Sequence, residues 1–170
     1  MNFDEAVKEK LADVQSRLRA AGAAGRFSLP ENLHLTLVFL GETSPHKVPA
    51  VRQAMDRTHI TPLDLTFDHV GSFRREGGDI WWIGLSPHPE LLRIQRELSG
   101  HLSDAGFPLE SRGFTPHLTL ARQVVLKQHA DRAALLPSPI GARADKISLM
   151  LSERPGGRLT YTELYAKGGA

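Results

Sequence analysis

The tetrapeptide His-Leu-Thr-Leu occurs twice in this chain, at residues 34–37 and 117–120. The dipeptide Gly-Gly also recurs, at 77–78 and 156–157, and its two copies are separated by nearly the same length of chain. Two repeats in the same order with similar offsets indicate an internal duplication, with one unit at about residues 3–85 and the other at about 90–166. Two units are too few for a solenoid, so we expect the halves to pack as pseudo-symmetric lobes of one domain.

Hydrophobic periodicity predicts the same order of elements in both halves, which is helix, strand, helix, strand, strand. In the first half we expect a helix from about 3 to 22, a strand over 30–41, a helix over 44–55, and strands over 63–73 and 79–85. In the second half we expect a helix over 91–106, a strand over 114–121, a weaker helix over 129–136, and strands over 145–152 and 159–166. This pattern predicts an α/β (α+β) fold of two lobes, in which two mainly antiparallel sheets flank a central cleft and helices cover the outside.

Length and composition limit the number of domains and the class of protein. At 170 residues, with no linker-like or low-complexity stretch, residues 1–170 are expected to form a single domain. The chain has no cysteine, which excludes disulfide frameworks and a cysteine nucleophile and fits a reducing compartment. We find no secretory signal at the start and no apolar run of about 18 residues, so we expect a cytoplasmic protein without a membrane partner. The net charge of +2 is too small for a broad nucleic-acid-coating surface.

The repeated tetrapeptide can carry acid-base chemistry. Side chains alternate along a strand, so His34 and Thr36 are expected on one face while Leu33, Leu35, Leu37 and Phe39 bury on the other. If a pseudo-twofold axis relates the halves, His117 and Thr119 lie across a groove from the first pair. Two imidazoles flanking one groove suit phosphodiester cleavage, because a neutral histidine accepts a proton and a protonated one donates. Threonine hydroxyls can hydrogen-bond the phosphate oxygens.

The other six histidines are weaker candidates. His46, His59, His88, His101 and His129 fall at helix ends, beside prolines or on predicted surfaces, where solvation or local contacts explain them. His69 lies in a predicted strand and can face either side. A metal site on His34 and His117 lacks a nearby acidic ligand or a His-x-His pair, and we expect neither a metal nor another cofactor. A duplicated packing motif is the alternative interpretation, although leucines alone would serve packing.

Two segments resemble a known family. Residues 26–41 (RFSLPENLHLTLVFLG) and 114–122 (FTPHLTLAR) are similar to the paired His-x-Thr signatures of the two-histidine phosphoesterase superfamily. Within it, the chain most resembles the bacterial and archaeal RNA 2',3'-cyclic phosphodiesterases, the LigT-like group also called 2'-5' RNA ligases. The resemblance implies a bilobal fold with both signatures on strands, and metal-independent hydrolysis of an RNA 2',3'-cyclic phosphate to a 2'-phosphomonoester.

The resemblance also implies roles for individual residues. His34 would be the general acid that protonates the leaving 3' oxygen, and His117 the general base that activates water. Thr36 and Thr119 would bind phosphate oxygens. Arg122 matches an arginine that follows the second signature and would contact phosphate, but strict alternation places it with the buried leucines, so a surface arginine at the strand end is the alternative.

Three aromatic residues and one arginine are weaker candidates for contacts with a ligand. Arg26 matches a basic position upstream of the first signature. Trp81 and Trp82 are adjacent in a strand, so one is expected in the core while the other can stack on a nucleobase, as can Phe114.

The N-terminus departs from the family pattern. Relatives usually open with a β-strand, whereas this chain begins with Met1-Asn2-Phe3-Asp4, where that strand would already be ending. We expect a monomer without an obligate protein partner, but an uncovered strand edge would favour lower stability or strand-mediated self-association. A thermally robust, monodisperse monomer would contradict that second expectation.

The expected partners are RNA ends bearing a 2',3'-cyclic phosphate, or small cyclic nucleotides. Weak reverse 2'-5' ligation is chemically possible. Two other functions stay open, namely a phosphodiesterase for another cyclic or 2',5'-linked nucleotide and a non-catalytic nucleotide- or RNA-binding module.

Overall fold

The computed structural model describes residues 1–168. Its helices and strands are, in chain order, α1 (Glu5–Ala20), β1 (Ala24–Phe27), α2 (Val48–Arg57), β2 (Leu63–Phe73), β3 (Asp79–Leu85), α3 (Pro89–Asp104), β4 (His117–Val125), α4 (Arg132–Leu135), β5 (Ile140–Ala144), β6 (Lys146–Glu153) and β7 (Thr160–Gly168). Short 3₁₀ helices occupy Pro30–Asn32, Pro45–Lys47 and Pro155–Gly157.

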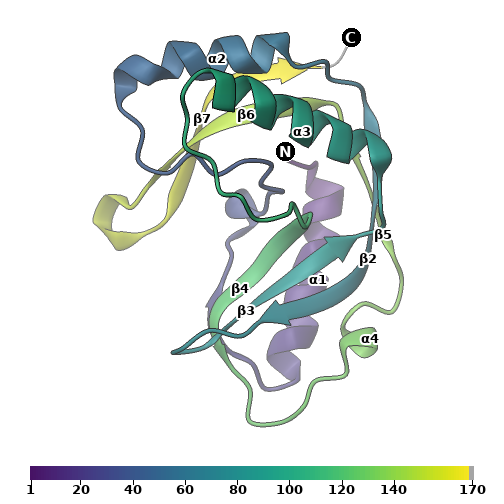
Figure 1. The fold of residues 1–170 in the computed structure, drawn as a ribbon. Helices are drawn as coiled ribbons and strands as arrows, with labels where there is room; N and C mark the ends of the chain where they lie inside the picture. The colour runs from purple at the N-terminus through teal and green to yellow at the C-terminus, as the bar shows by residue number, and fades with distance from the viewer. Residues whose placement is uncertain (169–170) are drawn as a thin grey trace.

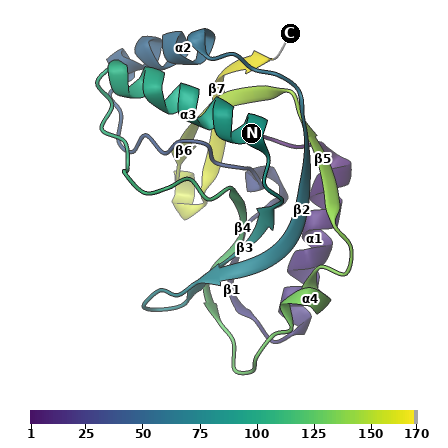
Figure 2. The same cartoon turned by 45° about the vertical axis from the view of Figure 1, so that its right-hand side comes forward.

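The strands form two antiparallel sheets. One has five strands in the order β1-β4-β3-β2-β5, and the other is the β6-β7 hairpin. Figures 1 and 2 show α1 and α4 together against the five-stranded sheet, with α2 and α3 at the other end of the molecule near the β6-β7 hairpin. The long strand β2 curves between these two ends (Figure 2). The chain therefore has an α+β fold with a curled antiparallel sheet, and its two antiparallel sheets agree with the sequence-based prediction.

The two sequence halves do not form separate lobes, which corrects one expectation. Strand β4 of the second half pairs with β3 of the first, so the five-stranded sheet contains both halves. Conversely, the β6-β7 end of the second half lies beside the first signature, where Asn32 Nδ2 donates to the Leu159 carbonyl at 3.0 Å. Each hairpin thus packs against the signature of the other half.

The predicted strand over 30–41 is wrong. Residues 30–32 form a 3₁₀ helix, and the signature that follows makes only isolated bridges, from His34 to Asn2 and from Leu35 to Leu118. Residues 1 and 2 therefore pair with the edge of the first signature. A strand needs a continuous ladder of backbone hydrogen bonds. Single-residue bridges on each side do not make one.

Strands β1 and β5 were not predicted, because their sequences have little β character. Strand β1 is only four residues long, AGRF, and β5 reads IGARA. Glycine and alanine are depleted in strands. Each forms because a partner offers a free edge: β1 pairs with β4, and β5 pairs with the first residues of β2.

Most leucines that alternation placed on the buried face lie in the core, whereas Leu37 is only partly buried. Leu33, Leu35, Leu118 and Leu120 have no exposed surface. They pack in one hydrophobic cluster with the apolar stripe of α1, which comprises Val7, Leu11, Val14 and Leu18. Phe39 was expected on the same buried face but is 72% exposed, because the chain has left its pairing partners by then. No helix within residues 1–168 combines the length and the apolar character that crossing a bilayer demands.

Candidate active site

The two signatures meet antiparallel at the edge of the five-stranded sheet. Leu35 lies opposite Leu118. One residue to either side, His34 is therefore opposite Thr119 and Thr36 is opposite His117. Directly opposed side chains on one face are about 5 Å apart at Cβ. Because both leucines point into the core, the two histidines and two threonines share the other face, with each histidine diagonal to the other.

Strands β3 and β2 extend this arrangement into two rows. Trp82 pairs with Thr119 on one side and Gly71 on the other. In the next row, Gly84 pairs with His117 on one side and His69 on the other. The first row is thus His34-Thr119-Trp82-Gly71, and the second is Thr36-His117-Gly84-His69. We call this surface the site face.

Each signature histidine is oriented by the carbonyl two residues before it. His34 Nδ1 lies 2.7 Å from the Asn32 carbonyl, and His117 Nδ1 lies 2.6 Å from the Thr115 carbonyl. A carbonyl oxygen only accepts, so both Nδ1 atoms carry a proton. The Nε2 atom of each neutral ring is then free to accept one, and Thr36 Oγ1 lies 3.1 Å from that of His34. The matched geometry leaves Nε2 as the nitrogen that can accept a proton in both signatures.

Burial lowers the pKa of His34 below its ordinary value, the hydrogen bond to the Asn32 carbonyl opposes this, and the positive charges of the N-terminus and then of Arg122 add to the lowering. A half-buried imidazole is harder to protonate because the charged form loses solvation. The resting ring therefore favours its neutral form, and an anion bound between His34 and Arg122 would raise the pKa again.

A β-bulge turns Arg122 toward the site face. Thr119 pairs with Trp82 and Ala121 pairs with Trp81, so Leu120 is an extra residue on β4. Leu120 and Ala121 are consequently both fully buried, and the exposed Arg122 follows on the side of His117 and Thr119. Bulges commonly re-aim side chains in this way. Strict alternation placed Arg122 on the buried side, and the bulge overturns that expectation.

Arg122 faces a second arginine across the sheet. Arg26 of β1 is its register partner, so both guanidinium groups share the site face. Neither has a carboxylate partner within residues 1–168. Like charges directly opposite one another are destabilising. The pair therefore favours an anionic ligand at this edge of the site.

The buried side chain of Gln15 in α1 holds the bulge. Its Nε2 donates to the Ser28 carbonyl at 2.8 Å and to the Leu120 carbonyl at 2.9 Å. Ser28 Oγ also donates to the Thr119 carbonyl at 3.0 Å. The sequence analysis missed Gln15, although a signal existed, since it lies four residues after Leu11 within the apolar stripe of its helix.

Replacing Gln15 with leucine should lower the free energy of unfolding by about 1–3 kcal/mol, since the Ser28 carbonyl loses the side-chain donor and the Leu120 carbonyl keeps only its bond from the Ser28 amide. For a chain of this length, each kcal/mol corresponds to about 2–4 °C in Tm. We also expect a weaker interaction of Arg122 with anions, because the bulge loses its support. Thermal melts check the first effect, with exposed Gln53→Leu as the control. A Gln15→Leu protein that melts with the wild type would contradict the assignment.

The two tryptophans divide between core and site. Trp81 is 5% exposed and packs in the core, while Trp82 is half-buried on the site face with its ring centroid 5.9 Å from that of His117. Phe73 adds a second aromatic ring there, 5.4 Å from His117. Phe114, the other stacking candidate, packs against the core. His69, which the sequence left on either side, lies on the site face.

The other histidines have local roles, as expected for most of them. His88 caps α3 by accepting from the Leu91 amide, and His101 lies 3.8 Å from Glu97. His46 and His59 are exposed. No cluster of three or more potential metal ligands occurs in the described part of the chain.

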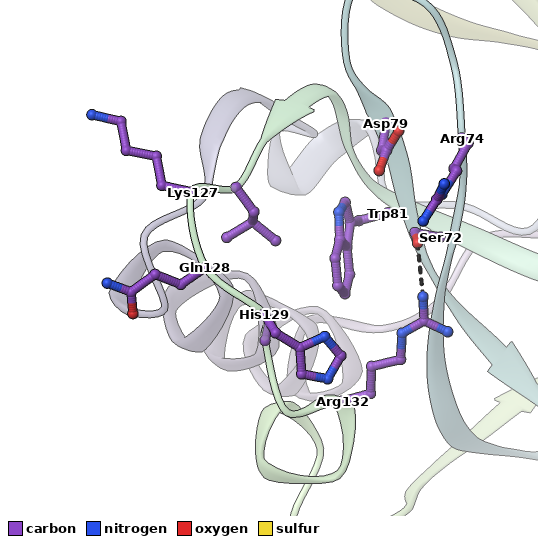
Figure 3. Close-up of a pocket in the computed structure, with 10 residues that line it drawn as sticks. Ser72, Arg74, Asp79, Trp81, Lys127, Gln128, His129 and Arg132 are labelled. Atoms are coloured by element: carbon purple, nitrogen blue, oxygen red, sulfur yellow. Dashed lines mark hydrogen bonds between the residues drawn. The ribbon is translucent and has the colours of Figure 1, made fainter.

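A cavity of about 360 Å³ borders Trp81, and the residues that line it are drawn in Figure 3. Its lining includes Arg74, Lys127, His129 and Arg132, and Arg132 donates to Ser72 Oγ at 2.9 Å. Trp81 and Trp82 are consecutive in β3 and point to opposite faces of the sheet. The cavity is therefore separated from the signature residues by the sheet itself.

The fold and the paired His-x-Thr segments resemble those of the two-histidine phosphoesterase superfamily. A sequence model described as the 2'-5' RNA ligase superfamily matches residues 4–156, and the chain belongs to this superfamily. An RNA 2',3'-cyclic phosphodiesterase of Escherichia coli K12 is 32% identical over 145 residues, covering 83% of this chain and 78% of the relative. One from Archaeoglobus fulgidus is 31% identical over 124 residues, covering 72% and 69%.

Solved structures agree with the family assignment. The crystal structure of E. coli LigT complexed with 3'-AMP superposes with a TM-score of 0.82 at 25% identity, covering 99% of this chain and 94% of LigT. LigT complexed with NADP+ superposes with a TM-score of 0.81.

Proposed function

We propose that this chain is an RNA 2',3'-cyclic phosphodiesterase that releases a 2'-phosphomonoester by general acid-base catalysis. One observation carries the proposal: the antiparallel pairing of Leu35 with Leu118 puts two histidines and two threonines on one face as diagonal pairs. Two imidazoles whose Nδ1 atoms are fixed by carbonyls present two Nε2 atoms to one ligand. The cyclic phosphodiesterase relatives support the same reaction.

In the proposed mechanism His117 Nε2 removes a proton from water as the water oxygen attacks phosphorus. The bond from phosphorus to the 3' oxygen breaks, and protonated His34 gives its Nε2 proton to that oxygen. The products are a 2'-phosphomonoester and a free 3' hydroxyl. Thr36 and Thr119 donate hydrogen bonds to the non-bridging oxygens, and Arg122 offsets their growing charge.

Nucleotide binding by a relative fits this substrate class. LigT has been crystallised with 3'-AMP and NADP+, both of which carry a phosphate on a ribose. By analogy we propose that the ligand of this chain is a ribonucleotide end whose phosphate lies at the paired signatures. We also propose that residues 1–170 act as one catalytic domain and as a monomer.

The test is incubation of an RNA ending in a 2',3'-cyclic phosphate with the protein in the presence of EDTA. We expect a 2'-phosphate end. A 3'-phosphate product would overturn the proposed direction of cleavage. Saturable binding of several cyclic phosphates without any product would instead identify a binding module. Ligation of the products back to a 2'-5' bond is expected only at high product concentration, because water competes.

The pH dependence of kcat/KM should reveal the acid. His34 must be protonated to donate, and its lowered pKa means that its protonated fraction falls as pH rises through a value below the ordinary one for histidine. Arg122→Gln removes one cause of that lowering, so the limb of the profile that depends on His34 should lie at higher pH than in the wild type. Rate profiles over about pH 4–9 measure this. The control is Arg143→Gln on β5; an Arg122→Gln limb that stays in place or moves to lower pH would contradict the role of His34.

A further inference from the structure

We propose that Trp82 and His69 form a nucleobase subsite beside His117, in which the indole is the stacking surface and the imidazole borders its edge. This inference rests on the proposed function, since the base belongs to the nucleotide whose phosphate lies at the signatures. Beyond the phosphate, it assigns a second ligand group to the site face. This group is a planar heterocycle, preferably a purine.

Two glycines make room for the indole. A Cβ on Gly71 would lie 2.3 Å from Trp82 Cζ2, and a Cβ on Gly84 would lie 2.9 Å from Trp82 Cζ3. Real side chains do not approach so closely, so only glycine permits the ring to lie over both backbones. The indole therefore lies close to the backbones of β2 and β3. The residue as a whole is half-buried, so part of the indole stays accessible on the site face, as a stacking surface requires.

The indole adjoins the proposed phosphate site. Trp82 pairs directly with Thr119, and neighbouring strands lie about 4.8 Å apart. Its ring centroid is 5.9 Å from His117, and Phe73 contacts both rings at 5.3 and 5.4 Å. A ribose bridges about this distance between its phosphate and its base. The position of the indole thus suits the base of the same nucleotide rather than a remote part of an RNA.

His69 stands at right angles to this surface. Its ring centroid lies 5.6 Å from that of Trp82 with an interplanar angle of 89°. Gly84 leaves the space between His69 and His117 without a side chain, and a Cβ there would lie 2.4 Å from His69 Nε2. His69 Nε2 therefore reaches across β3 toward the site.

Asp68 and Ser86 orient His69. His69 Nδ1 lies 2.6 Å from Asp68 Oδ1, and Ser86 Oγ donates to Asp68 Oδ2 at 2.6 Å. These two hydrogen bonds lower the pKa of Asp68, so it stays a carboxylate that accepts from Nδ1. In the neutral ring Nε2 is then an acceptor, suited to the amino group of a base. The indole supplies most of the affinity, and His69 discriminates among bases.

The experiment compares two substrates, adenosine 2',3'-cyclic phosphate and the base-free methyl riboside 2',3'-cyclic phosphate. Trp82→Leu should lower the ratio of their kcat/KM values by about 10- to 100-fold, the usual loss when base stacking is removed. Trp82→Phe should recover most of the ratio because it keeps an aromatic face. Equal losses on both substrates would show that Trp82 only supports His117 and would overturn the subsite.

A binding measurement separates this proposal from the proposed function. If the wild type cleaves neither substrate, calorimetry with adenosine 2'-monophosphate and inorganic phosphate still tests the subsite. Trp82→Leu should then weaken nucleotide binding about 10- to 100-fold and phosphate binding far less. Equal weakening, or none, overturns it. Circular dichroism melts identify a variant that has lost its fold, in which case Trp82→Phe and His69→Ala carry the test.

His69→Ala tests the polar edge. Purine riboside lacks the amino group of adenosine, so the wild type should prefer the adenosine cyclic phosphate over that of purine riboside. The variant should lose about 2- to 10-fold of this preference, the range expected for one hydrogen bond. An unchanged preference would overturn the assignment of His69.

Discussion

Replacing either His34 or His117 with alanine is expected to lower kcat on an RNA 2',3'-cyclic phosphate by about 10²- to 10⁴-fold. Each variant removes one of the two proton transfers, and the neighbouring threonines cannot replace it. Both rings lie on the surface of the sheet rather than in its core, so the variants should fold. Steady-state rates measure the loss of activity, and circular dichroism of the same samples checks that the variants fold.

His46→Ala is the matched control for these variants, because His46 is an exposed histidine outside the site face. It should retain the wild-type rate. If His34→Ala or His117→Ala keeps more than about a tenth of the wild-type kcat while chemistry is rate-limiting, the proposed acid-base pair is wrong.

A substrate with sulfur in place of the bridging 3' oxygen should separate the acid from the base. A thiolate, whose conjugate acid has a pKa of about 8.5, leaves without a proton, whereas an alkoxide does not. On this substrate His34→Ala should recover to within about tenfold of the wild type, while His117→Ala should still lose at least about 10²-fold. The measurement is the kcat of both variants on the oxygen and the sulfur substrates.

The reverse pattern, with rescue of His117→Ala alone, would exchange the two roles. Rescue of neither variant would mean that protonation of the leaving group is not the step that His34 serves. The lowered pKa of His34 makes this test worthwhile, since a resting neutral imidazole could serve as either partner. Binding of the anionic substrate is what we expect to raise its affinity for a proton.

Local sequence pattern predicted much of the fold. The helices α1, α2 and α3 and the two hairpins lie where periodicity placed them, because burial of one helix face or one sheet face is a local requirement. The strand over 30–41 failed for a nonlocal reason. Its residues have strand character, but within residues 1–168 only Asn2 and Leu118 pair with it, and no ladder forms there.

The site was predicted in composition but not in arrangement. The repeated tetrapeptide identified His34, Thr36, His117 and Thr119 as one group, and the antiparallel bridge between the signatures places them on one face. Their catalytic and binding roles remain proposals. Arg122 was ambiguous because its direction depends on a bulge, and that bulge is held by Gln15, more than a hundred residues earlier.

By itself, the sequence determined which residue types meet at the site and which side chains of each signature are buried, because alternation along the chain requires only neighbouring residues. Only the tertiary structure decided that hairpins pack against the signature of the other half. It also decided that a bulge turns Arg122 outward and that His69 and Trp82 join the same face. These features depend on which edges pair and where an extra residue is accommodated, and both are set by contacts between residues far apart in the chain.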